Sequence, residues 1–285
     1  MIVEHQSDLT LAVEQAMQAT PDPRLREVMS AFVRHAHAFV REVRPTDAEF
    51  ERGLGFLIAL GHATGETTNE VVLAADVLGV STLVDLLNNP LGDDVTATAL
   101  LGPFWRLNAP ACASGDCIAR DNTPGEPLTV SGQVRDRAGR PIAGAKVDVW
   151  QASPVGLYEN QDEGQPTMNL RGVFTADGDG RFALRTVRPA GYPVPTDGPV
   201  GDLLRAQRRH PYRPAHIHFM VTAPGYRTLV TQVFADDGEH LETDVTFSVV
   251  RSLVGRLASG PEGFRLAYDF VLEEGESRVP TPPIP

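Results

Sequence analysis

The segment His210-Pro-Tyr-Arg-Pro-Ala-His-Ile-His-Phe219 carries most of the chemical information in this chain. Side chains alternate between faces along a β-strand, so a strand here would project His216 and His218 to one side and Ile217 to the other. The apolar run Phe219-Met-Val-Thr-Ala223 favours such a strand. Two imidazoles on one face make half of a metal site, and imidazole suits Zn, Cu, Fe and Ni alike. The alternative is a half-buried strand on which hydrogen bonds satisfy both rings.

Length and composition limit the class of protein. The chain has 285 residues, 42% hydrophobic content and a formal net charge of −12. This length allows one large or two ordinary domains, and the acidic charge argues against nucleic acid or anionic membranes as partners. No apolar run is long enough to span a bilayer, and the first eight residues do not resemble a signal peptide. We therefore expect a cytoplasmic protein without a membrane span.

The first hundred residues are predicted to be helical. Thr46-Asp-Ala-Glu49 is a capping box that opens a helix ending near Ala63, and Thr67-Thr-Asn-Glu70 is a candidate for another. His35 and His37 would lie on opposed faces of a helix and are not expected to bind metal. Apolar residues at helical spacing predict a helix from Pro23 to Val43 (Leu25, Val28, Met29, Phe32, Ala36, Phe39, Val40, Val43) and one with the face Val71, Ala74, Ala75, Leu78 and Leu83.

After Asn88-Asn-Pro90 the pattern changes to short alternating runs separated by turn residues. We expect strands at 128–134 and 145–150, and a hairpin from Val173 to Leu184 with Asp177-Gly-Asp-Gly180 as its tight turn. This turn lacks the later ligands of a calcium loop. Regularly spaced short strands are typical of a β-sandwich. The predicted domains are therefore residues 1–102, helical, and residues 103–285, β-rich.

The histidine pair needs further ligands. Asp236, Asp237, Glu239 and His240 would suit a zinc or cupin-like hydrolase, or a facial-triad iron, but the segment is equally typical of a solvated turn. Tyrosines are the preferred partners. Tyr158 follows the strand that ends near Trp150, and Tyr192 lies in a loop held by prolines. Neither tyrosine has the alternating neighbours of a core strand residue.

Several motifs in one order resemble the intradiol ring-cleavage dioxygenases, which include catechol and hydroxyquinol 1,2-dioxygenases. They are Leu101-Gly-Pro-Phe104, Trp150-Gln-Ala152, Gly156-Leu-Tyr158, the Tyr192 loop, Arg213-Pro-Ala-His-Ile-His218 and Thr231-Gln-Val233. The resemblance implies an α+β protein with a helical N-terminal dimerisation domain followed by an Ig-like or transthyretin-like β-sandwich catalytic domain. It also implies a homodimer joined through the helical parts, with a phospholipid at the interface.

The same resemblance implies one non-haem Fe(III) per subunit, bound by Tyr158, Tyr192, His216 and His218. A phenol has a pKa near 10, so a tyrosinate at neutral pH requires a strong Lewis acid such as ferric iron. The family places Tyr192 as the ligand that leaves when substrate binds. Arg213 would stabilise negative charge on the ring, and Gln232 would support the ligands from the second layer.

The expected reaction is cleavage by O₂ of the ring between two hydroxylated carbons. By resemblance, the ring pocket is lined by Leu73, Asp76, Leu101, Gly102, Pro103, Phe104, Val194, Pro195, Arg213 and Thr246. A carboxylate in an aromatic pocket needs a polar partner, and a third hydroxyl on the substrate would supply one to Asp76. The run Asp76-Val-Leu-Gly-Val-Ser-Thr-Leu-Val-Asp85 is most similar to hydroxyquinol 1,2-dioxygenases, which would yield maleylacetate. Catechol or chlorocatechol, giving muconates, is the alternative substrate.

One rival from another class is a non-catalytic binding module. The segment from Val130 to Val149 resembles sandwich modules of secreted proteins, but such modules lack the Tyr and His set. The two cysteines, Cys112 and Cys117, are close enough for a disulfide, yet free thiols are predicted for a cytosolic chain.

Overall fold

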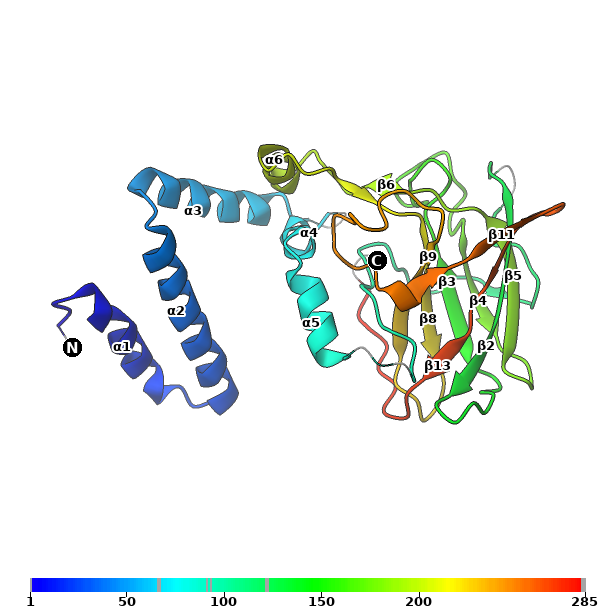
Figure 1. The fold of residues 1–285 in the computed structure, drawn as a ribbon, viewed down its shortest axis with the longest axis horizontal. Helices are drawn as coiled ribbons and strands as arrows, with labels where there is room; N and C mark the ends of the chain where they lie inside the picture. Colours follow the sequence, from blue (N-terminus) through cyan, green and yellow to red (C-terminus); the bar gives the residue numbers. More distant parts are fainter. Residues whose placement is uncertain (1, 66–67, 91, 93, 121–122, 283–285) are drawn as a thin grey trace. The chain divides into compact units, whose positions relative to one another are not determined.

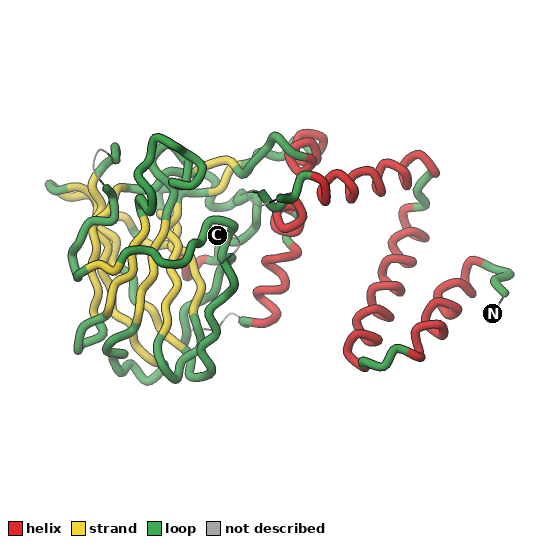
Figure 2. Tube along the Cα trace, turned by 180° about the vertical axis from the view of Figure 1, so that it is seen from behind, coloured by secondary structure: helices red, strands yellow, loops and turns green. Residues whose placement is uncertain are grey.

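A computed structural model describes residues 2–65, 68–90, 92, 94–120 and 123–282. The chain forms two compact units, residues 1–58 and 59–285. Figure 2 shows that the strands lie in the second unit and that the described part of the first is built from helices. The mixed α+β class is therefore confirmed. The predicted domain boundary at 102/103 stays a prediction. No helix in the described part of the chain is long and apolar enough to cross a membrane.

The first unit contains α1 (Gln6–Ala16), the 3₁₀ turn η1 (Met17–Ala19), α2 (Pro23–Val43) and the start of α3 (Asp47–His62). Asp22 caps α2 by accepting hydrogen bonds from the Arg24 and Leu25 amides. The capping box at the start of α3 is confirmed, because the Thr46 amide donates to Glu49 at 2.8 Å and the Glu49 amide donates to the Thr46 hydroxyl at 3.3 Å.

The apolar stripe that predicts α2 is left exposed within the chain. Phe32 is 63% exposed and Phe39 is 62% exposed, and the large apolar side chains of the predicted stripe share this property (Leu25, Val28, Met29, Phe32, Phe39, Val40, Val43). The periodicity correctly predicts a helix, and the large apolar side chains of its stripe are exposed among the described residues. A run of exposed apolar side chains of this kind marks an interaction surface.

The helices of the second unit differ from the prediction in one place. The face from Val71 to Leu83 was expected on one helix, but it is divided between α4 (Glu70–Val77) and α5 (Val80–Asn88). The break falls at Gly79, whose φ of +71° is left-handed and cannot continue a right-handed helix. Asn69 caps α4 by accepting from the Val72 amide at 3.0 Å. Thr67 of the predicted capping box lies outside the described residues.

The strands form a sandwich of two sheets, which can be followed in Figure 1. The first sheet has the order β1-β4-β3-β8-β9-β10, and the second has the order β11-β12-β2-β13 with β5 paired to β2. The bounds in the first sheet are β1 Ala111–Cys112, β4 Arg171–Thr175, β3 Lys146–Trp150, β8 His216–Thr222, β9 Leu229–Ala235 and β10 Val254–Gly255. Those in the second are β11 Leu257–Gly260, β12 Gly263–Ala267, β2 Pro127–Asp136, β13 Phe270–Leu272 and β5 Arg181–Val187.

The predicted hairpin between residues 173 and 184 is wrong. β4 pairs with β1 and β3, whereas β5 pairs with β2 in the other sheet. The tight turn at Asp177 is present, with the Gly180 amide donating to the Asp177 carbonyl at 3.0 Å, but it carries the chain from one sheet to the other. Local alternation and turn residues predict strands and a turn, and they do not specify which strands pair.

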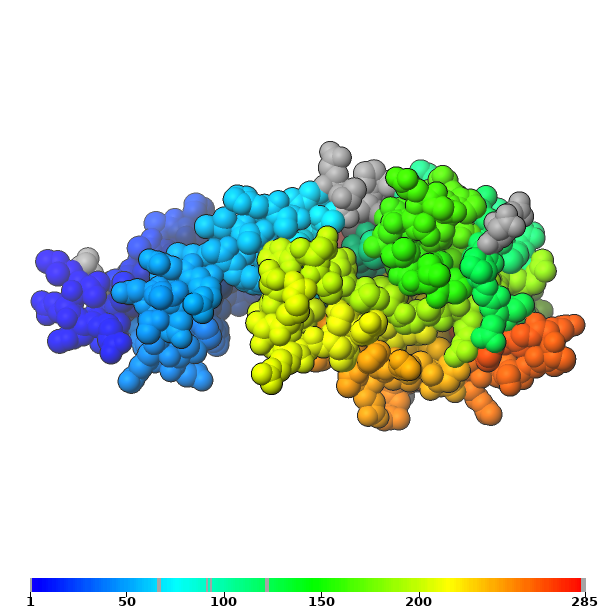
Figure 3. All heavy atoms as spheres, turned by 90° about the horizontal axis from the view of Figure 1, so that it is seen from above, coloured from blue at the N-terminus to red at the C-terminus, as the bar shows by residue number. Residues whose placement is uncertain are grey.

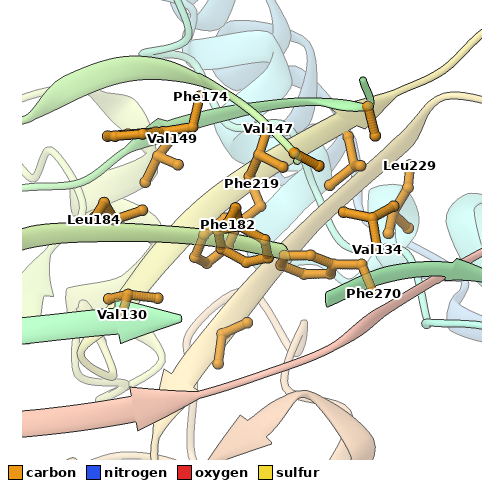
Figure 4. Packing of buried hydrophobic residues seen from close by; sticks show 14 of the residues in the cluster. Val130, Val134, Val147, Val149, Phe174, Phe182, Leu184, Phe219, Leu229 and Phe270 are labelled. Atoms are coloured by element: carbon orange, nitrogen blue, oxygen red, sulfur yellow. The ribbon is translucent and has the colours of Figure 1, made fainter. Parts of the chain in front are cut away.

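The core lies between the two sheets. Figure 4 shows Phe182, Phe219 and Phe270 together near its centre, and their ring centroids are 5.0–5.7 Å apart in the pairs Phe182–Phe270 and Phe219–Phe270. Ile217, Phe219 and Val221 of β8 belong to this core. Because side chains alternate along a strand, His216 and His218 point to the opposite, outer face of the sheet.

Candidate active site

The outer face of the first sheet carries one row of side chains across four strands. Trp150 of β3 is in register with Arg171 on one side and with His218 on the other, and His218 is in register with Gln232 of β9. The rings of Trp150 and His218 stack, with centroids 4.8 Å apart and planes at 11°. This stacking fixes the plane of the His218 ring against a fully buried tryptophan.

Four polar atoms converge above this row. The Tyr158 and Tyr192 hydroxyls are 3.2 Å apart, Tyr192 Oη is 3.4 Å from His216 Nε2, and the Nε2 atoms of His216 and His218 are 3.1 Å apart. All four side chains are buried. Tyr192 belongs to the short ribbon β6 (Tyr192–Pro193) and β7 (Tyr212–Arg213), whereas Tyr158 lies in the loop after β3. The structure thus brings together the four residues for which the sequence predicts a metal site.

The two imidazoles are held neutral. Burial, followed by the charge of Arg213, lowers the pKa of His216 to about 3, and burial also lowers the pKa of His218 well below its ordinary value. His216 Nδ1 lies 2.7 Å from the Pro214 carbonyl, so Nδ1 carries the proton and Nε2 is the unprotonated nitrogen. Among the described residues His218 Nδ1 is buried without a hydrogen-bond partner. A neutral imidazole with its partner nitrogen protonated is the form that binds a metal.

The donor set fits a transition-metal ion. Ligand atoms bound at about 2.0–2.1 Å around one such ion lie roughly 3 Å from one another, the spacing of these four atoms. Burial, with the neighbouring Tyr192, raises the pKa of Tyr158 well above its ordinary value. A phenol in this position ionises only if a strong cation replaces the proton. Two phenols and two neutral imidazoles therefore suit a highly charged ion such as ferric iron.

Arg213 connects this cluster to the buried polar residues around it. Its Nη1 is 3.2 Å from His216 Nε2, its Nη2 donates to Gln232 Oε1 at 2.8 Å, and its Nε donates to Asp244 at 3.2 Å. Gln232 in turn donates to the Leu100 carbonyl at 2.6 Å. The side-chain hydrogen bonds of Gln232 in the described part of the chain therefore go to Arg213 and Leu100, although Gln232 is in register with His218.

A cavity of about 110 Å³ opens beside Tyr192, one of the four donor residues. A cavity of roughly 150 Å³ holds benzene, so this space is of the size of one aromatic ring. Nine of the ten predicted pocket residues line it (Leu73, Asp76, Gly102, Pro103, Phe104, Val194, Pro195, Arg213, Thr246), as do Tyr192, Thr68, Asn69, Glu70, Val72, Leu100 and Gln161. Leu101 instead packs against the buried aromatic cluster that contains Phe104 and Trp150.

Asp76 places a carboxylate in the wall of this cavity. Burial raises its pKa above the ordinary value, and a hydrogen bond from Ser81 and the charge of Arg213 oppose that rise only in part. Ionising this group while it faces an apolar ring is unfavourable unless a polar partner is present. Ser81 meets this need in part, and a hydroxyl on a ligand at this side of the ring would favour the ionised carboxylate further.

The structure adds site residues that the sequence does not predict. Asp244 pairs with Arg213, and Ser248 donates to Asp244 at 2.8 Å. Glu70 is 5% exposed, lines the cavity and accepts from the Val200 amide at the start of α6 (Pro199–Ala206) at 3.0 Å. Figure 3 shows the segment near residues 205–215 (yellow) beside the segment near residues 240–250 (orange). The two segments are joined by a hydrogen bond from the Val245 amide to the Tyr212 carbonyl. No local pattern marks residue 244 or 248, because their partner lies more than thirty residues away.

The alternative metal ligands, in the segment from Asp236 to His240, do not form a metal site with the histidine pair in the described part of the chain. His240 stacks on Tyr212, with ring centroids 5.2 Å apart, and lies against His210 at 4.4 Å. Within the ranges that the structure describes, no three His, Cys, Asp or Glu side chains come together as a metal site. Tyr212 is 43% exposed and is absent from the cavity wall. Cys112 and Cys117 are free thiols.

The fold and the donor set define a class of enzyme, one in which a β-sandwich bears a buried site of two tyrosines and two histidines. Family models for "Dioxygenase" and "Catechol dioxygenase N terminus" match residues 100–274 and 22–94. The chain belongs to the intradiol ring-cleavage dioxygenases. Enzymes of this family generally depend on non-haem iron.

Individual relatives cover almost the whole chain. It is 44% identical over 268 residues to the 6-chlorohydroxyquinol 1,2-dioxygenase of Cupriavidus pinatubonensis, covering 94% of this chain and 97% of that protein. It is 44% identical over 239 residues to the hydroxyquinol 1,2-dioxygenase of a Rhizobium species, covering 84% and 81%. The solved hydroxyquinol 1,2-dioxygenase from Pseudomonas putida DLL-E4 superposes with a TM-score of 0.91 at 40% identity, covering 95% and 99%.

Proposed function

We propose that this enzyme cleaves hydroxyquinol (1,2,4-trihydroxybenzene) with O₂ to give maleylacetate, in the catabolism of aromatic compounds. The observation that carries the substrate assignment is Asp76, a carboxylate in the wall of a ring-sized cavity beside Tyr192. The third hydroxyl of hydroxyquinol can donate to it, and catechol has no such hydroxyl. The named relatives with 44% identity support the same substrate class.

The metal that we assign is one Fe(III) per subunit, held by Tyr158, Tyr192, His216 and His218. When bound, ferric iron would bind the two adjacent hydroxyls of the substrate and activate its ring toward O₂. Tyr192 lines the cavity and Tyr158 does not. Because Tyr192 lines the cavity, we propose it as the tyrosine that accepts a proton from a substrate hydroxyl.

The remaining residues bind and stabilise the ring. Arg213 lines the cavity and keeps its positive charge, because Asp244 raises its pKa against the opposing effect of burial. It would stabilise negative charge that develops on the ring. Pro103, Phe104, Val194 and Pro195 supply the apolar walls that hold the ring and exclude water.

Oxygen uptake with hydroxyquinol, catechol and chlorocatechols, compared side by side under identical conditions, tests this assignment. We expect the highest kcat/KM for hydroxyquinol, with maleylacetate as product, and slower conversion of catechol to cis,cis-muconate. If the wild-type enzyme has a higher kcat/KM for catechol or a chlorocatechol than for hydroxyquinol, the hydroxyquinol assignment is wrong and that compound is the substrate. Loss of the reaction on treatment with an iron chelator, and its return with added iron, would test the metal.

We also propose a cytoplasmic homodimer joined through the helical parts, with a phospholipid at the interface. The exposed apolar side chains of α2 and α3 support this, including Phe32, Phe39 and Leu57 at 62–63% exposure. Sedimentation at micromolar concentration should show a dimer, and organic extraction followed by mass spectrometry should release a phospholipid. Only monomer at that concentration would contradict the dimer.

A further inference from the structure

Asp244 is among the most heavily hydrogen-bonded carboxylates described in this chain. It is 3% exposed, and both of its oxygens accept from Arg213, at 3.2 Å from Nε and 3.3 Å from Nη2. The Thr246 hydroxyl donates to it at 2.9 Å, the Ser248 hydroxyl at 2.8 Å and the Ser248 amide at 3.1 Å. Burial alone would raise the pKa of Asp244, but the charge of Arg213 and these hydrogen bonds lower it well below its ordinary value.

These bonds leave the guanidinium of Arg213 with two different edges. The edge formed by Nε and Nη2 is tied to Asp244, with Nη2 also bonded to Gln232 and Ser248. The other end, Nη1, points to His216 Nε2 at 3.2 Å, and Arg213 lines the cavity. A planar guanidinium that is gripped along one edge cannot rotate, so the direction of Nη1 follows from the position of Asp244.

The charge balance of the site gives this pairing a second effect. Arg213 is a fixed cation next to two imidazoles whose lone pairs are needed for a metal ion, and it lowers the pKa of both rings. An unpaired cation there would repel a metal cation as well. Asp244 supplies the compensating negative charge at the edge of the guanidinium formed by Nε and Nη2.

We propose that Asp244 is a positioning residue of this enzyme. It acts through Arg213, fixing the direction of Nη1, the atom of the guanidinium 3.2 Å from His216 Nε2, so that it can stabilise charge on the ring. This role rests on the proposed function of Arg213. Among the described residues, the hydrogen bonds of the Asp244 carboxylate go to Arg213, Thr246 and Ser248 and to none of the four donors, and Asp244 is not among the residues that line the cavity.

The test is Asp244→Asn, alone and combined with Arg213→Ala, in the iron-loaded enzyme. Misplacing a catalytic group by about 1 Å can cost roughly 10²-fold in rate. We therefore expect kcat for hydroxyquinol to fall about 10- to 100-fold and KM to change less than about threefold, because charge on the ring develops mainly after binding. The double variant should be no slower than Arg213→Ala alone. Additive losses would overturn the proposal.

Asp136→Asn is the matched control. Asp136 is also 3% exposed and paired with an arginine, Arg140, at 2.6 Å, but it lies at the end of β2 in the other sheet. The same chemical change there should lower the melting temperature and leave kcat unaltered. A fall in kcat equal to that of Asp244→Asn would show a general effect of removing a buried carboxylate, and would contradict a positioning role.

One readout does not depend on turnover, and a second variant covers the case in which Asp244→Asn does not fold. A crystal structure of Asp244→Asn should show the Arg213 guanidinium rotated from its present contacts, and an unmoved Arg213 would overturn the proposal. If Asp244→Asn does not fold, Ser248→Ala removes a bond to both Asp244 and Arg213 and should lower kcat about 3- to 10-fold at constant KM, and an unchanged kcat would again overturn it. If wild-type enzyme cleaves none of the diols, the proposed function fails, whereas the crystal structure still decides the role of Asp244.

Discussion

Gly102 lies directly against the ring of His218. A Cβ at residue 102 would stand 3.3 Å from His218 Cε1 and 3.8 Å from Nε2, and the backbone there has a φ of +72°. Glycine is favoured at this position for two reasons, its left-handed backbone and the close approach of the chain to a ring of the donor cluster, which an added Cβ would push by a few tenths of an ångström. The same residue lines the cavity, so one loop shapes both the donor cluster and the cavity beside it.

Gly102→Ala should displace the His218 ring and lower the iron content of the purified protein. Gly139→Ala is the control, because Gly139 has a similar φ of +79° but no atom within 4 Å of an added Cβ. Each substitution costs roughly 1–2 kcal/mol in backbone strain. Metal analysis together with thermal unfolding separates the two effects. Equal iron content in both variants would show that the contact with His218 does not matter.

The four-donor assignment predicts a clear division among the tyrosines. His216→Ala and Tyr158→Phe should each lose iron or the visible tyrosinate-to-iron band, because each removes one of four ligands. Tyr212→Phe should keep both, since Tyr212 is 43% exposed and stacks on His240. Absorption spectra and metal content are the measurements. If Tyr212→Phe bleaches the protein and Tyr158→Phe does not, the ligand set is wrong.

Asp76→Ala should reduce the preference for hydroxyquinol over catechol by about tenfold, the effect of losing a hydrogen bond to a charged group. Catechol turnover should change less, because catechol lacks the hydroxyl that Asp76 would accept from. The ratio of kcat/KM values for the two substrates is the measured quantity. Equal losses on both substrates would mean that Asp76 is structural.

Asp148 should make stability depend on pH. Burial raises its pKa to about 6, although Trp105 donates to it at 2.9 Å. An unfolded aspartate has a pKa of about 3.9. The folded state therefore holds more protons between about pH 4 and pH 6, and the free energy of unfolding falls as pH rises through that window. The loss is at most about 3 kcal/mol.

Asp148→Asn cannot ionise and should remove this contribution. Compared with wild type, the variant should be relatively more stable above about pH 6 and show a flatter profile between about pH 4 and 6. Melting temperatures of both proteins across this range are the measurement. Parallel profiles would show that Asp148 is not the titrating group.

The sequence by itself determined the local elements and the type of chemistry. Helical spacing gives α2 with its observed ends, and strand alternation puts His216 and His218 on one face of β8, because both periods are properties of the backbone. The motifs that contain Tyr158 and Tyr192 identify the family, since a specific donor set in a fixed order rarely arises by chance.

Tertiary structure alone decided the pairings between distant segments. Three features depend on contacts that the local sequence pattern does not predict. They are the helix break at Gly79, the pairing of β4 and β5 in different sheets, and the ion pair between Asp244 and Arg213. Asp244 lies in a polar segment that carries no recognisable motif. Its partner Arg213 lies 31 residues earlier in the chain, and only the fold brings the two side chains together. The sequence specifies the chemical groups of each side chain, but the burial of a side chain and its partners depend on which segments pack together in the folded chain.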